Sequence, residues 1–149
     1  TLALQNGDVP DNFTMLDQHG EMVDLYSFCG TQLMVVVSAG WCGPCRSEAE
    51  TLQALAEENP DIQILQMLFQ NNNGETPDLD FIQGWADDYG FVNVAALSTN
   101  EAPATTAEEY FALQSSIWDI DGYIPTVYHL DTNMTVISAD EGQTEPPSL

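Results

Sequence analysis

The sequence contains no lysine and a single arginine, Arg46, against 24 acidic residues among 149 positions, which gives a formal net charge of −23. Nucleic-acid-binding proteins neutralise phosphates with clustered Lys and Arg side chains, and docking to anionic membranes uses the same residues. The composition therefore excludes both kinds of partner. We expect a soluble, self-repelling monomer that favours cationic partners. Adaptation to high salt and a merely acidic marine or extracytoplasmic protein are two equally good interpretations of such a surface.

Long apolar runs are also missing. The longest, residues 33–37, has the length of a strand, whereas a membrane span needs roughly 18 apolar residues. We therefore predict no stable membrane insertion of this segment. Residues 1–4 lack the charged start and apolar region of a signal peptide, although the chain does not begin with Met. At roughly 100–200 residues per domain, residues 1–149 are expected to form one domain.

Cysteine and histidine are scarce. Three cysteines are too few for a disulfide scaffold, and two of them form a Cys-x-x-Cys pair. The histidines, His19 and His129, are 110 positions apart, whereas a structural zinc site needs a second cysteine pair or suitably spaced histidines. We predict neither a metal site nor a bound cofactor. The third cysteine, Cys29, is expected to be a small buried hydrophobic residue, with an intermolecular or regulatory thiol as the alternative.

Periodicity predicts the order of the elements. Residues 13–16 and 22–25 flank a Gly-containing turn, which predicts a hairpin. Residues 33–38 form a continuous β-branched run, typical of a strand buried on both faces. Alternating β and α segments followed by a hairpin indicate an α/β sandwich with a mixed sheet. The other expected elements are helices at 42–59, at 78–89 and from 105 or 106 to 117, strands at 62–69, 92–97, 126–130 and 134–138, and a loose tail at 141–149.

The Cys-x-x-Cys pair lies where the predicted strand 33–38 turns into a helix. Cys42 would stand at the helix N-terminus, where unpaired N–H groups and the helix dipole lower the pKa of a thiol and favour the thiolate that attacks disulfides. Cys45 follows one turn later and is the natural resolving thiol. Pro44 fits the first helical turn, where a missing N–H costs little. A static structural disulfide is the less favoured alternative to redox activity.

Several segments resemble a known family. Trp-Cys-Gly-Pro-Cys at 41–45, after an apolar strand, resembles the active-site motif of the thioredoxin superfamily. Residues 7–25 are similar to the N-terminal hairpin of its TlpA/ResA-like branch, and residues 38–48 to the core signature of that branch. Residues 123–126 resemble the cis-proline loop. The resemblance covers residues 7–142. It implies a thioredoxin-like three-layer sandwich, with a central mixed β-sheet and an N-terminal extension, residues 1–30, that carries the hairpin.

The resemblance also implies roles for residues. Cys42 would be the nucleophile that forms a mixed disulfide with the substrate, and Cys45 would resolve it. Pro125 would follow a cis peptide bond and place the backbone of Ile124 beside Cys42, where it pairs with an extended substrate. Trp41 would shield the disulfide and belong to the docking surface, or simply pack.

Two charged side chains near the pair leave alternatives open. Glu48, three residues after Cys45, is either a buried acid that moves protons for that cysteine or a solvent-facing helix glutamate. Val36 stands where thioredoxin itself has a buried aspartate, which favours Glu48 for this role. Arg46 is expected to be solvated or paired with Glu50, with assistance to the thiolate as the alternative.

The predicted function is thiol–disulfide exchange with protein cysteines in the direction of reduction, with electrons supplied by a donor protein. The branch implies an extracytoplasmic location, periplasmic or membrane-tethered, with a cytoplasmic one as the alternative. Two other functions stay open. One is a thioredoxin-like binding module with a static disulfide. The other is a peroxiredoxin-like peroxidase, against which the missing Pro-x-x-x-Thr-x-x-Cys motif counts.

Overall fold

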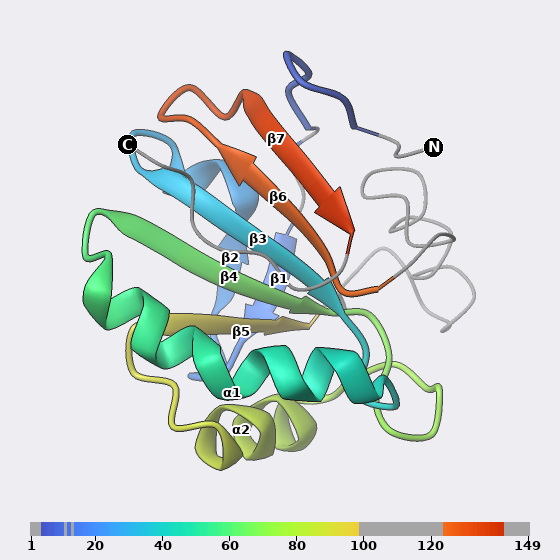
Figure 1. The fold of residues 1–149 in the computed structure, drawn as a ribbon. Helices are drawn as coiled ribbons and strands as arrows, with labels where there is room; N and C mark the ends of the chain where they lie inside the picture. The colour runs from blue at the N-terminus through green and yellow to red at the C-terminus, as the bar shows by residue number, and fades with distance from the viewer. Residues whose placement is uncertain (1–3, 11, 13, 99–123, 142–149) are drawn as a thin grey trace.

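The computed structural model describes residues 4–10, 12, 14–98 and 124–141. Its strands form one mixed sheet in the order β2-β1-β5-β4-β3-β6-β7 (Figure 1). This confirms the predicted α/β fold with a central mixed sheet. The strands are β1 (Thr14–Asp17), β2 (Met22–Asp24), β3 (Gln32–Ser38), β4 (Ile62–Leu68), β5 (Val94–Ser98), β6 (Thr126–Leu130) and β7 (Val136–Glu141), and the helices are the 3-10 helix η1 (Leu25–Phe28), α1 (Gly43–Glu58) and α2 (Leu79–Asp88).

The strand that leads into the Cys-x-x-Cys pair lies inside the sheet, with a neighbour on each edge. β3 pairs in parallel with β4 on one side and antiparallel with β6 on the other. All its residues after Gln32 are buried, because the run Leu33–Val37 has apolar side chains on both faces. A strand with neighbours on both edges and cover on both faces has little freedom to move. The cysteine pair therefore follows a strand whose position is fixed by the sheet.

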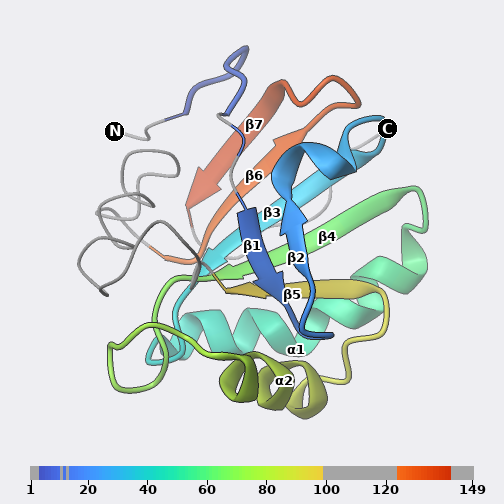
Figure 2. The same ribbon diagram turned by 180° about the vertical axis from the view of Figure 1, so that it is seen from behind.

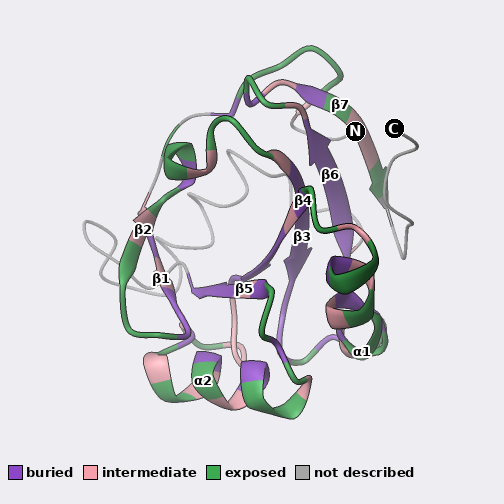
Figure 3. Cartoon of the chain, turned by 90° about the vertical axis from the view of Figure 1, so that its left-hand side faces the viewer, coloured by how far each residue is buried: buried purple, intermediate pink, exposed green. Residues whose placement is uncertain are grey.

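The α-helices α1 and α2 cover the same face of the sheet. Their inward sides are buried (Figure 3), and residues such as Ala49, Leu52 and Trp85 form one cluster with Met34 and Val36 of β3. Seen from behind, the strands β1 and β2 at one end of the sheet lie in front of its other strands (Figure 2). The second cluster lies on this face and includes Met15 of β1 and Val35 of β3. The predicted helix at 105–117 lies outside the described residues.

The predicted hairpin forms and continues the main sheet, since β1 also pairs antiparallel with β5. Asp17 Oδ1 closes its turn by accepting from the backbone N–H groups of His19 and Glu21, at 2.8 and 2.9 Å. The buried side chain of Gln18 donates to the carbonyl of Val94 and accepts from the amide of Ala96, so it pairs with β5 as a strand would. The hairpin is thus an integral part of the sheet.

Some predicted boundaries were wrong for reasons of local hydrogen bonding. The strand expected at 92–97 begins at Val94, because Gln53 Oε1 accepts from the amides of Val92 and Asn93. Leu25, expected at the end of a strand, begins the 3-10 helix η1. Each error lies where a polar side chain or a tight turn competes with strand pairing.

The last hairpin is also shifted from the prediction. The strand expected at 134–138 runs from Val136 to Glu141, because Asp131 Oδ1 accepts from the amides of Asn133 and Thr135 and closes a turn first. Met134 takes a left-handed conformation in that turn, with φ 66°. The tail expected from residue 141 was therefore wrong by one residue, since Glu141 belongs to β7, and the rest of it lies outside the described residues. No helix in the described ranges is long and apolar enough to cross a membrane.

Candidate active site

A disulfide joins Cys42 and Cys45 at the start of α1, with 5.2 Å between their Cα atoms. Cys42 is the N-cap residue, with extended backbone angles, and its sulfur accepts a hydrogen bond from the amide of Cys45 at 3.2 Å. The carbonyl of Cys42 accepts from the amide of Arg46 at 3.1 Å, which continues the helix. The sulfur atoms therefore lie at the positive end of the helix dipole, as the sequence predicted.

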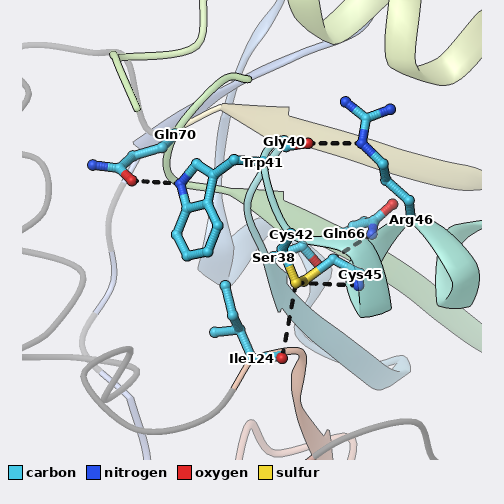
Figure 4. The surroundings of a disulfide bond; sticks show 9 residues. All are labelled: Ser38, Gly40, Trp41, Cys42, Cys45, Arg46, Gln66, Gln70 and Ile124. Carbon is cyan, nitrogen blue, oxygen red and sulfur yellow. Dashed lines mark hydrogen bonds between the residues drawn. A yellow bond between two sulfur atoms is a disulfide. The ribbon is translucent and has the colours of Figure 1, made fainter. Parts of the chain in front are cut away.

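The cis-proline loop comes to the pair through sheet pairing. β6 lies antiparallel beside β3, with Val37 opposite Thr126, so the residues just before Thr126 reach the end of β3. The peptide bond between Ile124 and Pro125 is cis, as expected. The carbonyl oxygen of Ile124 lies 3.8 Å from the sulfur of Cys42 (Figure 4). The main-chain carbonyl of Ile124, a hydrogen-bond acceptor, thus faces the Cys42 sulfur. We call the region bordered by Trp41, Cys42 and Ile124 the mouth of the site (Figure 4).

The indole of Trp41 lies beside the disulfide and is 50% exposed. Its Nε1–H donates to Oε1 of Gln70 at 2.7 Å (Figure 4). Its ring meets Phe69 edge to face, with 6.5 Å between the ring centroids. The hydrogen bond to Gln70 therefore fixes one edge of the indole, while much of the ring surface is exposed to solvent. Together with Ile124, it borders the mouth of the site.

Sequence reasoning missed the contact between the active-site turn and the loop that supports it. We call residues 70–75, which follow β4, the Asn71 loop. Asn71 Oδ1 accepts from the amides of Asn73 and Glu75, and its own amide donates to the carbonyl of Glu75, so the loop closes on itself. The amide of Gly40 donates to the carbonyl of Gln70 at 2.8 Å. A run of three Asn and a Gly is typical of a loop, but nothing in it indicates which segment the loop contacts.

A buried polar chain, also missed, lies on the helix-covered face just before the active-site turn. The indole N–H of Trp85 donates to Oε1 of Gln66 at 2.7 Å, and Nε2 of Gln66 donates to Oγ of Ser38 at 3.1 Å (Figure 4). All three residues are buried. A polar group without a partner at this depth costs about 1–3 kcal/mol, so the chain ties α2, β4 and β3 to one arrangement.

The acidic candidate, Glu48, is 1% exposed and lies one turn after Cys45 on α1. The solvent-facing alternative is therefore wrong. Val36 is fully buried and lies opposite Gln66 in the β3–β4 pairing, so no carboxylate occupies that position. Glu48 is the only carboxylate among the buried side chains of α1, within the described part of the chain. A carboxyl group buried at this position can take up and release a proton.

Cys29 departs from the prediction. It is exposed, not a buried hydrophobic residue, because it follows η1 at the surface. Its sulfur lies 3.6 Å from the carbonyl of Thr132. His129 is 2% exposed within β6. Among the described residues, no group of three or more His, Cys, Asp or Glu side chains is placed to hold a metal ion.

The fold and the disulfide together define the class of the protein. A cysteine pair at the first turn of a helix, at the end of the central strand of a mixed sheet, characterises the oxidoreductases of the thioredoxin fold, and the pair here is closed as a disulfide. Residues 6–139 match the family model described as the AhpC/TSA family, and the chain belongs to that family. No curated protein matches the sequence.

Solved structures with the same fold are distant in sequence. The thioredoxin domain of a thiol-disulfide oxidoreductase from Bacteroides vulgatus has a TM-score of 0.69 at 15% identity, over 93% of this chain and 90% of that one. A secreted disulfide oxidoreductase of Mycobacterium tuberculosis has a TM-score of 0.62 at 18% identity, over 91% and 87%. Peroxidoxin BcpB from the same organism has a TM-score of 0.66 at 17% identity, over 95% and 88%. At such identities the likeness concerns the fold alone.

Proposed function

We propose that the protein reduces disulfides in other proteins by thiol–disulfide exchange, with Cys42 as the attacking thiolate and Cys45 as the resolving thiol. The observation that carries the proposal is the disulfide at the N-terminus of α1, whose Cys42 sulfur faces the mouth of the site. Cys42 is 4% exposed and Cys45 is fully buried, so a substrate sulfur reaches Cys42 first.

The surroundings of Cys42 support a reductant. Among the described residues, one main-chain donor, the amide of Cys45, contacts its sulfur, and no cation does. In the reduced protein the thiol can donate to the carbonyl of Ile124, which favours the thiol over the thiolate. A strong oxidant such as DsbA, at about −120 mV, owes its potential to a stabilised reduced form. We therefore expect a potential nearer to that of thioredoxin, about −270 mV.

The residues around the disulfide have further roles in the proposed reaction. Trp41 presents an open ring surface for apolar side chains of a substrate, and the cis-proline loop presents main-chain groups to an extended segment. Glu48 would accept and return the proton of Cys45 during resolution, because it is buried one turn away on the same helix. The reaction requires no metal or cofactor, since the electrons move between sulfur atoms.

The test is reduction of insulin disulfides with dithiothreitol as the electron source. The wild type should accelerate insulin precipitation, Cys42→Ser should abolish the acceleration, and Cys45→Ser should accumulate a mixed disulfide with the substrate. Cys29→Ser is the matched control, since its thiol is exposed on another segment, and it should keep the wild-type rate. Equal rates for the wild type and Cys42→Ser would contradict the proposal and favour the alternative function, a binding module with a static disulfide.

Redox direction and location need separate measurements. Equilibration with glutathione gives the reduction potential, and a value near that of DsbA would reverse the proposed direction. A hydrogen peroxide assay tests the peroxidase alternative, for which we expect no Cys42-dependent turnover. An extracytoplasmic location, with a separate protein as electron donor, is part of the proposal, and the secreted relative from Mycobacterium tuberculosis supports it. Fractionation of cells that express the full-length gene product tests the location.

A further inference from the structure

Arg46, the only Lys or Arg residue in the sequence, is hydrogen-bonded to neutral groups nearby, and no carboxylate pairs with it within the described part of the chain. Its Nε donates to the carbonyl of Gly40 at 2.8 Å, and Nη2 donates to Oδ1 of Asn72. Its guanidinium carbon lies 5.3 Å from the ring centroid of Trp85. In Figure 4 the guanidinium points away from the two sulfur atoms. Glu50, one turn further along α1, is not among its partners in the described part of the chain, so that predicted pairing was wrong.

These contacts join three segments at one point. Arg46 belongs to the first turn of α1, Gly40 to the turn between β3 and α1, and Asn72 to the Asn71 loop. Gly40 packs so closely on that loop that an added Cβ would lie 2.7 Å from Oδ1 of Asn72. The planar guanidinium reaches both acceptors at once, because its N–H groups point in fixed, divergent directions. We call these two hydrogen bonds the Arg46 clasp.

We propose that Arg46 is a positioning residue for thiol–disulfide exchange, which holds the turn from Gly40 to Cys42 against the Asn71 loop. This inference rests on the proposed function. The clasp fixes the carbonyl of Gly40, two residues before the nucleophile, and thereby keeps the Cys42 sulfur at the helix N-terminus and opposite Ile124. Arg46 acts through this geometry and not through an electrostatic effect on the thiolate, since its guanidinium is directed to the other side of the turn.

Three variants separate geometry from charge. Arg46→Lys keeps the charge but cannot reach both acceptors, Arg46→Met removes the charge, and Asn72→Ala removes an acceptor without changing any charge. If Arg46 positions the turn, all three should lower kcat/KM for insulin reduction by at least about fivefold, the size typical of one intramolecular hydrogen bond. The loss should be the same at low and high salt. The double variant Arg46→Met, Asn72→Ala should be no slower than Arg46→Met alone, since Asn72→Ala removes a contact that Arg46→Met already lacks.

A matched control uses the other side-chain contact that ties α1 to a loop. Gln53 Oε1 accepts from the amides of Val92 and Asn93, away from the disulfide. Gln53→Ala should reduce stability towards urea while leaving kcat/KM at the wild-type value. This comparison separates a positioning effect from general loosening of α1. The thiolate absorbance of reduced protein against pH supplies a second readout, and the Cys42 pKa should be the same in Arg46→Lys and Arg46→Met.

Two results would overturn the inference. One is a wild-type rate in Arg46→Lys together with a salt-sensitive loss and a raised Cys42 pKa in Arg46→Met, which would make the charge the operative property. The other is a wild-type rate in Asn72→Ala. Failure of the proposed function looks different, because the wild type would then be no faster than Cys42→Ser before any Arg46 variant is compared.

Discussion

The close approach of Gly40 to the Asn71 loop makes Gly40→Ala the sharpest test of how the active-site turn is supported. A Cβ at this position would lie 2.7 Å from Oδ1 of Asn72 and from Cζ of Phe81, and 2.8 Å from the backbone carbon of Asn71. The loop backbone cannot rotate aside as a side chain can. Turn and loop must separate by about 0.6 Å to restore ordinary contact.

We expect Gly40→Ala to lower the free energy of unfolding by about 1–3 kcal/mol, the usual cost of overpacking. The displaced carbonyl of Gly40 would also strain its bond to Arg46, so insulin reduction should slow by roughly tenfold, since sub-ångström misplacement of a reacting group is costly. Urea denaturation of the oxidised protein measures the first effect and the insulin assay the second.

Two other glycines provide matched controls, because a Cβ built on Gly43 or Gly84 would have no atom of a more distant described segment within 4 Å. Gly43→Ala lies in the same turn and should leave stability near the wild-type value. Gly84→Ala lies within α2 and should raise it by up to about 1 kcal/mol, since alanine is the better helix former. Wild-type stability and rate in Gly40→Ala would refute the argument that close packing on the Asn71 loop defines the turn.

Three further results are expected. Trp85→Phe leaves Oε1 of Gln66 without its buried donor and should lower the free energy of unfolding in urea by about 1–3 kcal/mol. A change below experimental error would contradict the role of Trp85 in the polar chain. Glu48→Gln should slow exchange and alter its pH–rate profile, whereas an unchanged profile would leave Glu48 with a packing role only. Exchange with a neutral disulfide substrate should accelerate as salt rises, because a net charge of −23 disfavours the thiolate and salt screens that charge, and a flat response would contradict this reasoning.

Much of the architecture could be predicted because it depends on local patterns. The β-branched run of β3, the capping Asp78 of α2 and the Gly-containing turn of the first hairpin each specify their own element. The cysteine pair was predictable for the same reason, since the strand, the turn and the helix start are consecutive. The structure bears out this part of the site, including the cis bond before Pro125.

The parts that could not be predicted depend on contacts between distant segments. Gln70, Asn72 and Gln66 are ordinary polar residues in the sequence, and they gain their roles from the β3–β4 pairing and from the loop that follows β4. The position of Arg46 could not be predicted for a similar reason. The sequence offered solvent, Glu50 and the thiolate, whereas the structure places Arg46 against Gly40 and Asn72, which come together only through the packing of the Asn71 loop. Exposed Cys29 shows that residue type alone is a weak guide to burial.

The antiparallel pairing of β6 with β3 also has a consequence for how the site is completed as the chain folds. The disulfide joins residues three apart, whereas the carbonyl opposite it comes from a residue 82 positions away from Cys42. Contacts of high sequence separation form at a greater entropic cost, and during synthesis β6 emerges after β3, α1 and β4. The cysteine pair can therefore oxidise before the Ile124 carbonyl that faces it is in place. A closed disulfide in the newly made chain therefore shows only that the two cysteines have oxidised. If the proposed function holds, a substrate can bind only after β6 has paired with β3.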